Sequence, residues 1–222
     1  MNFSEEIAKK LWSLKAVEVN PKKPRRWVSG YTMPMYLDAR KLLGNYEGRT
    51  ITENGLVQLP VDFERFDLIA GVANGGVPWA TFLADYYKKP LGYISKPKAH
   101  GFEGEIYGIA PEDVEGKRIL LVDDSVSFGT SSIRAIKALE KLGGICNEGV
   151  SVYNYGFREA IKNFMEEVPK FSGFSSILYY ETLICVATKE GRLNQTQLDA
   201  LAEWRTDPFN WGEKHGFSKE QK

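Results

Sequence analysis

Short apolar runs alternate with amphipathic stretches between residues 67 and 155, and this alternation limits the fold more than any other feature of the chain. The apolar runs are typical of buried strands and lie at 67–72, 91–94, 118–122 and 148–155. Two intervening stretches, 78–88 and 129–142, carry apolar residues at helical spacing. Strands that are apolar on both faces and separated by helices form a parallel sheet covered on both sides. The sequence therefore predicts an α/β fold.

The segments outside this core have weaker patterns. Ser4 is expected to cap a helix that runs through 7–14, and Pro78 to begin the helix over 78–88. Residues 20–34 contain three prolines and four basic residues, which predicts a loop with a short strand. We expect a long loop over 100–117 and two further helices within 181–212.

Composition excludes several classes of protein. The 222 residues include 29 Lys plus Arg and 29 Asp plus Glu, and a net charge of zero argues against a nucleic-acid-binding protein. With 43% hydrophobic and 26% charged residues, the chain is not disordered. It has no signal-like leader and no apolar run of the ~18 residues that span a membrane, so we expect a cytoplasmic protein without membrane contact. Cys146 and Cys185 lie in apolar stretches and are expected to be buried and reduced.

Residues 119–132 carry the clearest chemical signal. A buried strand delivers Asp123 and Asp124 at its carboxyl end, and a loop rich in Ser, Gly and Thr then opens a helix. The backbone N–H groups of such a loop suit a phosphate, and the two carboxylates can accept hydrogen bonds from vicinal hydroxyls. A 5-phosphorylated ribose fits this arrangement. The loop lacks the Gly-Lys-Ser/Thr of a Walker A motif, so ATP hydrolysis is not indicated.

The segment 119–132 resembles the phosphoribosyl-pyrophosphate (PRPP) motif of type I phosphoribosyltransferases. Further segments are similar to orotate phosphoribosyltransferases, in part to their Gram-positive-type branch, and lie at 15–21, 27–40, 69–78, 95–101, 155–157 and 203–211. The similarity covers roughly residues 7–212. It implies a type I phosphoribosyltransferase fold: one domain over 1–222, with a small hood at about 15–40, a core at about 60–180 and a helical C-terminal tail over 181–222.

The resemblance implies that the chain transfers 5-phosphoribosyl from PRPP to orotate, giving orotidine 5′-monophosphate and pyrophosphate in de novo pyrimidine biosynthesis. The implied PRPP-binding residues are Asp123, Asp124, Ser125, Val126, Ser127, Phe128, Gly129, Thr130, Ser131, Asn74, Gly75, Lys98 and His100. Lys98 and His100 would be catalytic and would neutralise the pyrophosphate from a mobile loop that reaches into the partner subunit of a homodimer. Ser127, Tyr36 and Leu37 would contact orotate. Magnesium (Mg²⁺) would be held mainly by substrate and water.

Four places depart from the family pattern. Phe128 stands where the family usually has Thr, and Ile94 where it usually has an Arg that contacts pyrophosphate. Glu18 replaces a basic residue, and Arg25-Arg26 replace an aromatic-Thr pair. Loss of one charge-assisted contact weakens binding roughly ten- to a hundredfold. Arg25, Arg26 and Lys96 are the candidates to restore the charge.

Two other functions stay open at this point. A PRPP-dependent transferase for another nucleobase would act on a purine or a different pyrimidine and not on orotate. A non-catalytic PRPP-sensing regulator would be expected to carry a nucleic-acid-binding module or a basic face. Trp204 and Trp211 are expected to be packing anchors of the tail, and no role is expected for His215.

Overall fold

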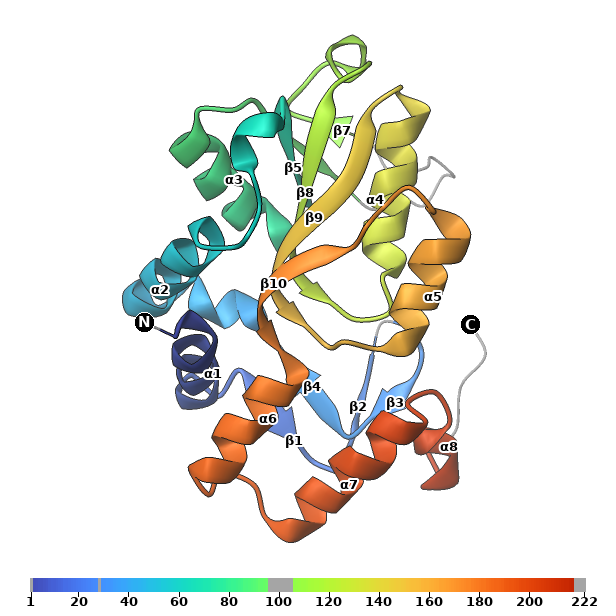
Figure 1. The fold of residues 1–222 in the computed structure, drawn as a ribbon. Helices are drawn as coiled ribbons and strands as arrows, with labels where there is room; N and C mark the ends of the chain where they lie inside the picture. The colour runs from blue at the N-terminus through green and yellow to red at the C-terminus, as the bar shows by residue number, and fades with distance from the viewer. Residues whose placement is uncertain (1, 28, 96–105, 218–222) are drawn as a thin grey trace.

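A six-stranded sheet forms the centre of the molecule, with the strand order β10-β9-β8-β5-β6-β7 (Figure 1). The computed structural model describes residues 2–27, 29–95 and 106–217. The strands are β5 Leu68–Val72, β6 Leu91–Ile94, β7 Ile106–Tyr107, β8 Arg118–Val126, β9 Ile145–Asn154 and β10 Phe174–Tyr179. All neighbours pair in parallel except β6 and β7, which are antiparallel. The predicted α/β fold with a parallel sheet is confirmed.

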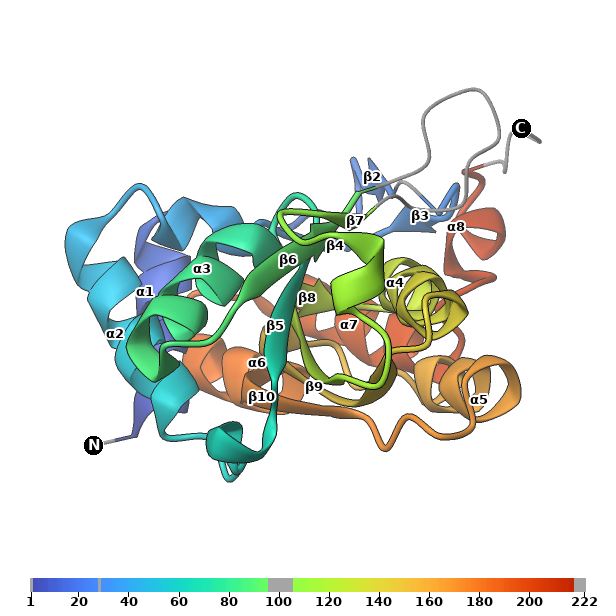
Figure 2. The same cartoon turned by 90° about the horizontal axis from the view of Figure 1, so that it is seen from above.

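Helices cover both faces of this sheet, as Figure 2 shows. On one side lie α1 Phe3–Ser13, α2 Tyr46–Val57 and α3 Gly76–Tyr87, and on the other α4 Thr130–Lys141 and α5 Arg158–Glu167. Strand β5 is buried along its whole length because it is central and covered on both faces. Within the described part of the chain, no helix has the length and apolar character needed to cross a membrane.

Two small sheets and three helices gather beyond one end of the central sheet, at the bottom of Figure 1. The sheets pair β1 Val17–Val19 with β4 Met35–Leu37 and β2 Arg25–Arg26 with β3 Thr32–Met33. The helices are α6 Tyr180–Lys189, α7 Gln195–Thr206 and α8 Trp211–Lys214, and three short 3-10 turns lie at η1 Ala39–Leu42, η2 Phe63–Arg65 and η3 Pro111–Asp113. We call β1 to β4 the hood and α6 to α8 the tail.

Hydrogen bonds from tryptophan and glutamine side chains tie the tail to the hood. Gln197 Nε2 donates to the Val19 carbonyl at 2.7 Å, and Trp204 Nε1 donates to Met33 Sδ at 2.9 Å. Trp204 and Trp211 are 0% and 1% exposed, so their predicted role as packing anchors is confirmed. The two ends of the chain therefore form one layer beside the carboxyl ends of the parallel strands.

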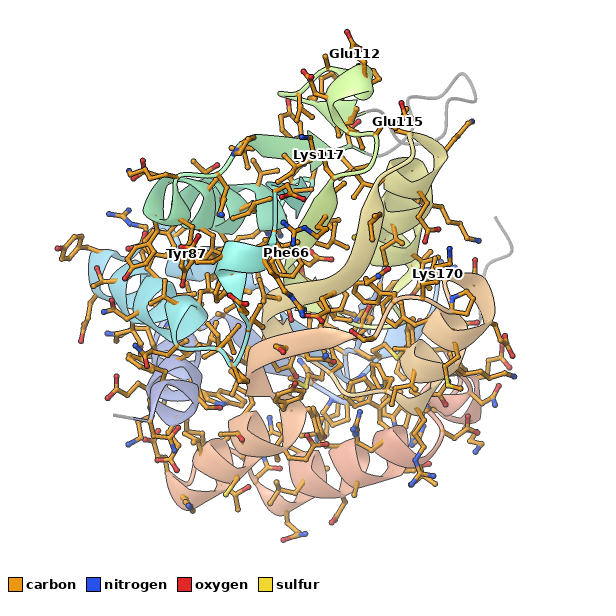
Figure 3. The ribbon with its side chains drawn as sticks, turned by 45° about the horizontal axis from the view of Figure 1, so that its top comes forward. Phe66, Tyr87, Glu112, Glu115, Lys117 and Lys170 are labelled. Atoms are coloured by element: carbon orange, nitrogen blue, oxygen red, sulfur yellow. The ribbon has the colours of Figure 1, made fainter. Side chains whose placement is uncertain are left out.

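The far end of the sheet carries charges of both signs. Figure 3 shows Glu112, Glu115 and Lys117 pointing outward there, whereas Phe66 is buried. The ring of Tyr87 stacks on Phe63, with their centroids 4.5 Å apart.

Several local predictions need correction. Asn2, not Ser4, caps α1, because its side chain accepts the Glu5 N–H. Helix α3 begins at Gly76, two residues before Pro78. The predicted loop over 100–117 contains β7, which pairs with Tyr93 and Ile94 along the edge of β6, and the turn η3. Of the two cysteines, Cys146 is buried as expected, but Cys185 is exposed because it lies on the outer face of α6.

Candidate active site

The carboxyl ends of β5 and β8 lie side by side, because Leu68–Val72 pairs in parallel with Arg118–Val126. The loop after β5 therefore meets the acidic pair on β8. A Cβ on Gly75 would overlap the Asp124 carboxylate, and one on Gly76 would overlap the Val122 carbonyl oxygen. Only residues without a side chain allow this close approach of loop and strand. The structure thus brings together the predicted site residues Gly75 and Asp124; the peptide bond that precedes Asn74 is cis.

The two adjacent carboxylates occupy different environments. Asp123 is 5% exposed and accepts hydrogen bonds from Ser132 Oγ and from the Asp124 N–H, both at 2.9 Å. Burial raises the pKa of Asp123 well above its usual value, and the charge of Asp124 raises it further. Burial also raises the pKa of Asp124, against the lowering effects of its contact with Asp123 and of the positive charge of Arg40. Hydroxyl donors or a cation at this pair would favour the ionised carboxylates.

The loop after Asp123 and Asp124 leads to backbone N–H groups that can bind an anion. Strand β8 extends past Asp124 to Val126, because Ser125 and Val126 still pair with β9, so the loop begins later than the sequence predicted. Gly129 caps α4 with φ +81° and brings no side chain to the first turn of the helix. Asparagine side chains cap α1, α2 and α7, whereas α3, α5, α6 and α8 lack a side-chain cap, as α4 does. The first N–H groups of α4, at Thr130 and Ser131, can therefore donate to a phosphate.

The ring of Phe128 anchors this loop to the tail and the hood. It is 5% exposed and stacks on Phe157 and Phe209, with centroid separations of 4.8 Å and 4.7 Å. It also lies 6.0 Å from the ring of Trp27, and Asn163 Nδ2 donates to its carbonyl at 3.0 Å. The aromatic side chain at position 128 thus has a structural explanation: it is part of a buried aromatic cluster.

Substituting Phe128 by Ala should lower the free energy of unfolding by about 3–5 kcal/mol, the usual cost of removing a buried phenyl ring. Urea denaturation followed by tryptophan fluorescence measures the loss. Phe82→Ala is the matched control, since Phe82 is only partly buried on α3 and contacts Tyr86. Equal losses in the two variants would contradict an anchoring role for Phe128.

The hood brings Tyr36 and Leu37 of β4 to the same end of the sheet. Tyr36 pairs with Glu18 across the hood, and the Arg25 guanidinium lies 5.0 Å from the centre of the Tyr36 ring. Arg25 Nε donates to Glu18 Oε2 at 2.6 Å. Two of the positions expected to depart from the family pattern are therefore joined: Glu18 and Arg25 form an ion pair beside Tyr36. Ser127, also predicted to contact the base, is partly buried directly after β8.

Two residues that the sequence analysis gave no role complete this region. Burial raises the pKa of the Tyr155 hydroxyl, and a hydrogen bond with the backbone of Leu37 in the hood opposes this shift. Arg205 of α7 donates to the Tyr155 carbonyl at 2.7 Å and to the Gly156 carbonyl at 3.2 Å. The tail thereby holds the turn after β9. Tyr155 and Arg205 both lie in segments that resemble the family. This similarity is the signal in the sequence that could have identified them.

Three predicted residues are not placed by the structure: Lys96, Lys98 and His100 lie outside the described residues. Ile94 at the end of β6 is 3% exposed and brings no charge to the site. The described residues also hold no group of three or more His, Cys, Asp or Glu that could bind a metal.

Three comparisons with known proteins all match this chain to phosphoribosyltransferases. The model of the family described as "Phosphoribosyl transferase domain" matches residues 56–151. The chain is 34% identical to orotate phosphoribosyltransferase of Cytophaga hutchinsonii over 215 residues, which are 95% of this chain and 99% of the relative. It is 35% identical to the enzyme of that name from Staphylococcus haemolyticus over 206 residues, covering 91% and 98%. The solved structure of orotate phosphoribosyltransferase from Aeropyrum pernix superposes with a TM-score of 0.69 at 27% identity, covering 85% of this chain and 99% of that one.

Proposed function

The chain belongs to the orotate phosphoribosyltransferase family, and we propose that it transfers 5-phosphoribosyl from PRPP to orotate in pyrimidine biosynthesis. The products would be orotidine 5′-monophosphate and pyrophosphate. One observation carries the proposal: the Asp124 carboxylate lies against the backbone of the loop at Gly75, and its strand leads through residues 127–129 to the N-terminus of α4. A sugar between two phosphate groups fits this sequence of contacts.

We propose the following roles for the predicted residues. Asp123 and Asp124 accept hydrogen bonds from the two ribose hydroxyls. The backbone of 125–131 holds the ribose and the 5-phosphate, and Asn74 with Gly75 holds the pyrophosphate. Lys98 and His100, outside the described residues, are proposed to neutralise the leaving group. Tyr36, Leu37 and Ser127 are proposed to contact the base.

The chemistry follows from where charge develops. A ring nitrogen of orotate attacks the anomeric carbon while the bond from that carbon to the pyrophosphate oxygen breaks. The ribose gains positive character, and the departing pyrophosphate gains negative charge. Backbone N–H groups at the start of α3 are fixed before the reaction and can donate to the leaving oxygens, which lowers the barrier without reorganisation. When bound, Mg²⁺ would supply further charge neutralisation at the pyrophosphate.

Other properties of the family are proposed with it. These are a requirement for Mg²⁺, a homodimer whose subunits share the active sites through the segment around Lys98, a single domain over 1–222, and a cytoplasmic location. Sedimentation or light scattering would test the homodimer.

The test is the loss of absorbance at the ultraviolet band of orotate. We expect a loss that requires protein, PRPP and Mg²⁺ together, with each omitted in turn as a control. Turnover of another nucleobase but not of orotate would contradict the proposed substrate. Binding of PRPP by calorimetry, without turnover of any base, would contradict catalysis and favour a sensor.

A further inference from the structure

A small pocket lies at the carboxyl ends of β5 and β6, beside α4. Its lining includes Ala73, Ile94 and Ser95 from the two strand ends, and Ser131 and Arg134 from the helix. Ala73 begins the loop whose glycines touch β8, and Ser131 lies in the first turn of α4. The pocket therefore lies between the two elements proposed to hold the phosphate groups of PRPP.

Arg134 is the charged member of this lining, and its environment is unusual for an arginine in this molecule. The side chain is partly buried, yet no hydrogen bond, ion pair or ring contact joins its guanidinium to the described residues. Most other arginines of the described chain are paired, among them Arg25 with Glu18, Arg40 with Asp38, Arg118 with Asp67 and Arg205 with Glu181. A guanidinium without a protein partner keeps all its N–H donors available, so an anion that enters this pocket can bind it.

The position of Arg134 on the helix indicates which anion. Arg134 follows Ser131 by three residues, so both side chains lie on one face of α4. That face meets Ala73, Ile94 and Ser95, at the start of the pyrophosphate loop. The loop proposed to hold the 5-phosphate faces a different element. Its residue Gly129 packs against Phe164 of α5, so a Cβ added to Gly129 would lie 2.7 Å from Phe164 Cζ.

We propose that Arg134 binds the pyrophosphate group of PRPP and stabilises it as a leaving group. A guanidinium is always charged and offers several donors in one plane, which matches the oxygens of a diphosphate. Its stabilisation increases as the bond to ribose breaks, because negative charge then builds up on the leaving oxygens. Arg134 supplies positive charge in a pocket where Ile94 supplies none. This inference rests on the proposed function.

The experiment compares Arg134→Ala and Arg134→Lys with Lys137→Ala in the full chain. Lys137 lies one turn further along α4 and pairs with Glu167 of α5 at 2.7 Å, so it is a matched surface cation. Arg134→Ala should raise the KM for PRPP and the inhibition constant for inorganic pyrophosphate by about tenfold or more. Orotidine 5′-monophosphate, which carries the 5-phosphate but no pyrophosphate, should bind as before. Arg134→Lys should keep part of the effect, and Lys137→Ala should match the unmodified protein.

Two results would overturn the inference: unchanged inhibition by pyrophosphate in Arg134→Ala, or equal weakening of pyrophosphate and orotidine 5′-monophosphate. The second would assign the side chain to the 5-phosphate. If the unmodified protein shows no turnover, the proposed function fails instead. Calorimetric titration of inorganic pyrophosphate with Mg²⁺ into the unmodified protein and Arg134→Ala then still tests the arginine.

Discussion

Replacing Gly76 by alanine should lower kcat/KM about a hundredfold and destabilise the fold. The added Cβ would overlap the Val122 carbonyl oxygen and lie 3.0 Å from the Asp123 Cα, and both are backbone atoms of β8. Neither can rotate away, so α3 must move from the sheet and carry the Asn74-Gly75 backbone with it. Overpacking of this kind costs about 1–3 kcal/mol, and a displacement near 1 Å at a reacting group costs roughly 100-fold in rate.

Gly44→Ala is the matched control for this variant. A Cβ there would lie 3.8 Å from the Lys41 carbonyl oxygen, an ordinary contact distance. Steady-state kinetics with PRPP and urea denaturation should show a change in Gly76→Ala alone. Normal activity in Gly76→Ala would mean that the close approach of loop and strand is not needed for catalysis.

Asp123→Asn should give a protein that is more stable and nearly inactive. Burial raises the pKa of Asp123 in the folded protein, so its ionised form opposes folding. The stability that the protonated Asp123 contributes is fully present below the pKa of the unfolded chain, about 3.9. It is lost as pH rises through the higher pKa of Asp123 in the folded protein. Asparagine has no charge to desolvate, and it can still accept the Asp124 N–H and donate to Ser132 Oγ. Turnover should fall about 100-fold or more, because a charge-assisted bond to a ribose hydroxyl is lost.

Thermal melts at pH 4.5 and pH 8, together with the orotate assay, test this prediction. The stability gained by Asp123→Asn should be larger at pH 8. Asp67→Asn is a control with the opposite sign, since hydrogen bonds from Arg118 lower the pKa of Asp67. That variant should lose stability near neutral pH and keep its activity. If Asp123→Asn were less stable at pH 8, the buried carboxylate would not be a destabilising charge.

The sequence predicts the central strands well because each is a continuous apolar run with helices on either side. It predicts the strands at the two edges of the sheet and the helix α5 poorly. Strand β7 has only two residues and therefore no periodicity. Helix α5 carries Ala160, Ile161, Phe164 and Met165 at helical spacing, a pattern that the sequence analysis left unassigned. Ala160 and Phe164 are buried, whereas Ile161 and Met165 are 60% and 70% exposed. Strand β10 lies at the other edge of the sheet and was not assigned either.

The same distinction applies to the candidate site. Asp123, Asp124 and the loop that follows are contiguous, so their order along the chain is enough to suggest a phosphate and a sugar. Contacts between distant segments leave no local pattern. The stacking of Phe128 on Phe209 and the hydrogen bonds from Arg205 to the Tyr155 turn arise only when the tail packs against the core. For the same reason, Arg134 could be recognised only from the pocket it lines.

The joining of hood and tail has a consequence for synthesis on the ribosome. Val19 and Met33 emerge early, but their partners Gln197 and Trp204 are added more than 170 residues later. The central sheet can form in the meantime, since its strands lie between residues 68 and 179. The apolar strands of the hood, by contrast, lack their packing partners on α7 until α7 has left the ribosomal exit tunnel. A nascent chain of this protein would therefore contain its phosphate loop well before it contains a complete pocket for the base.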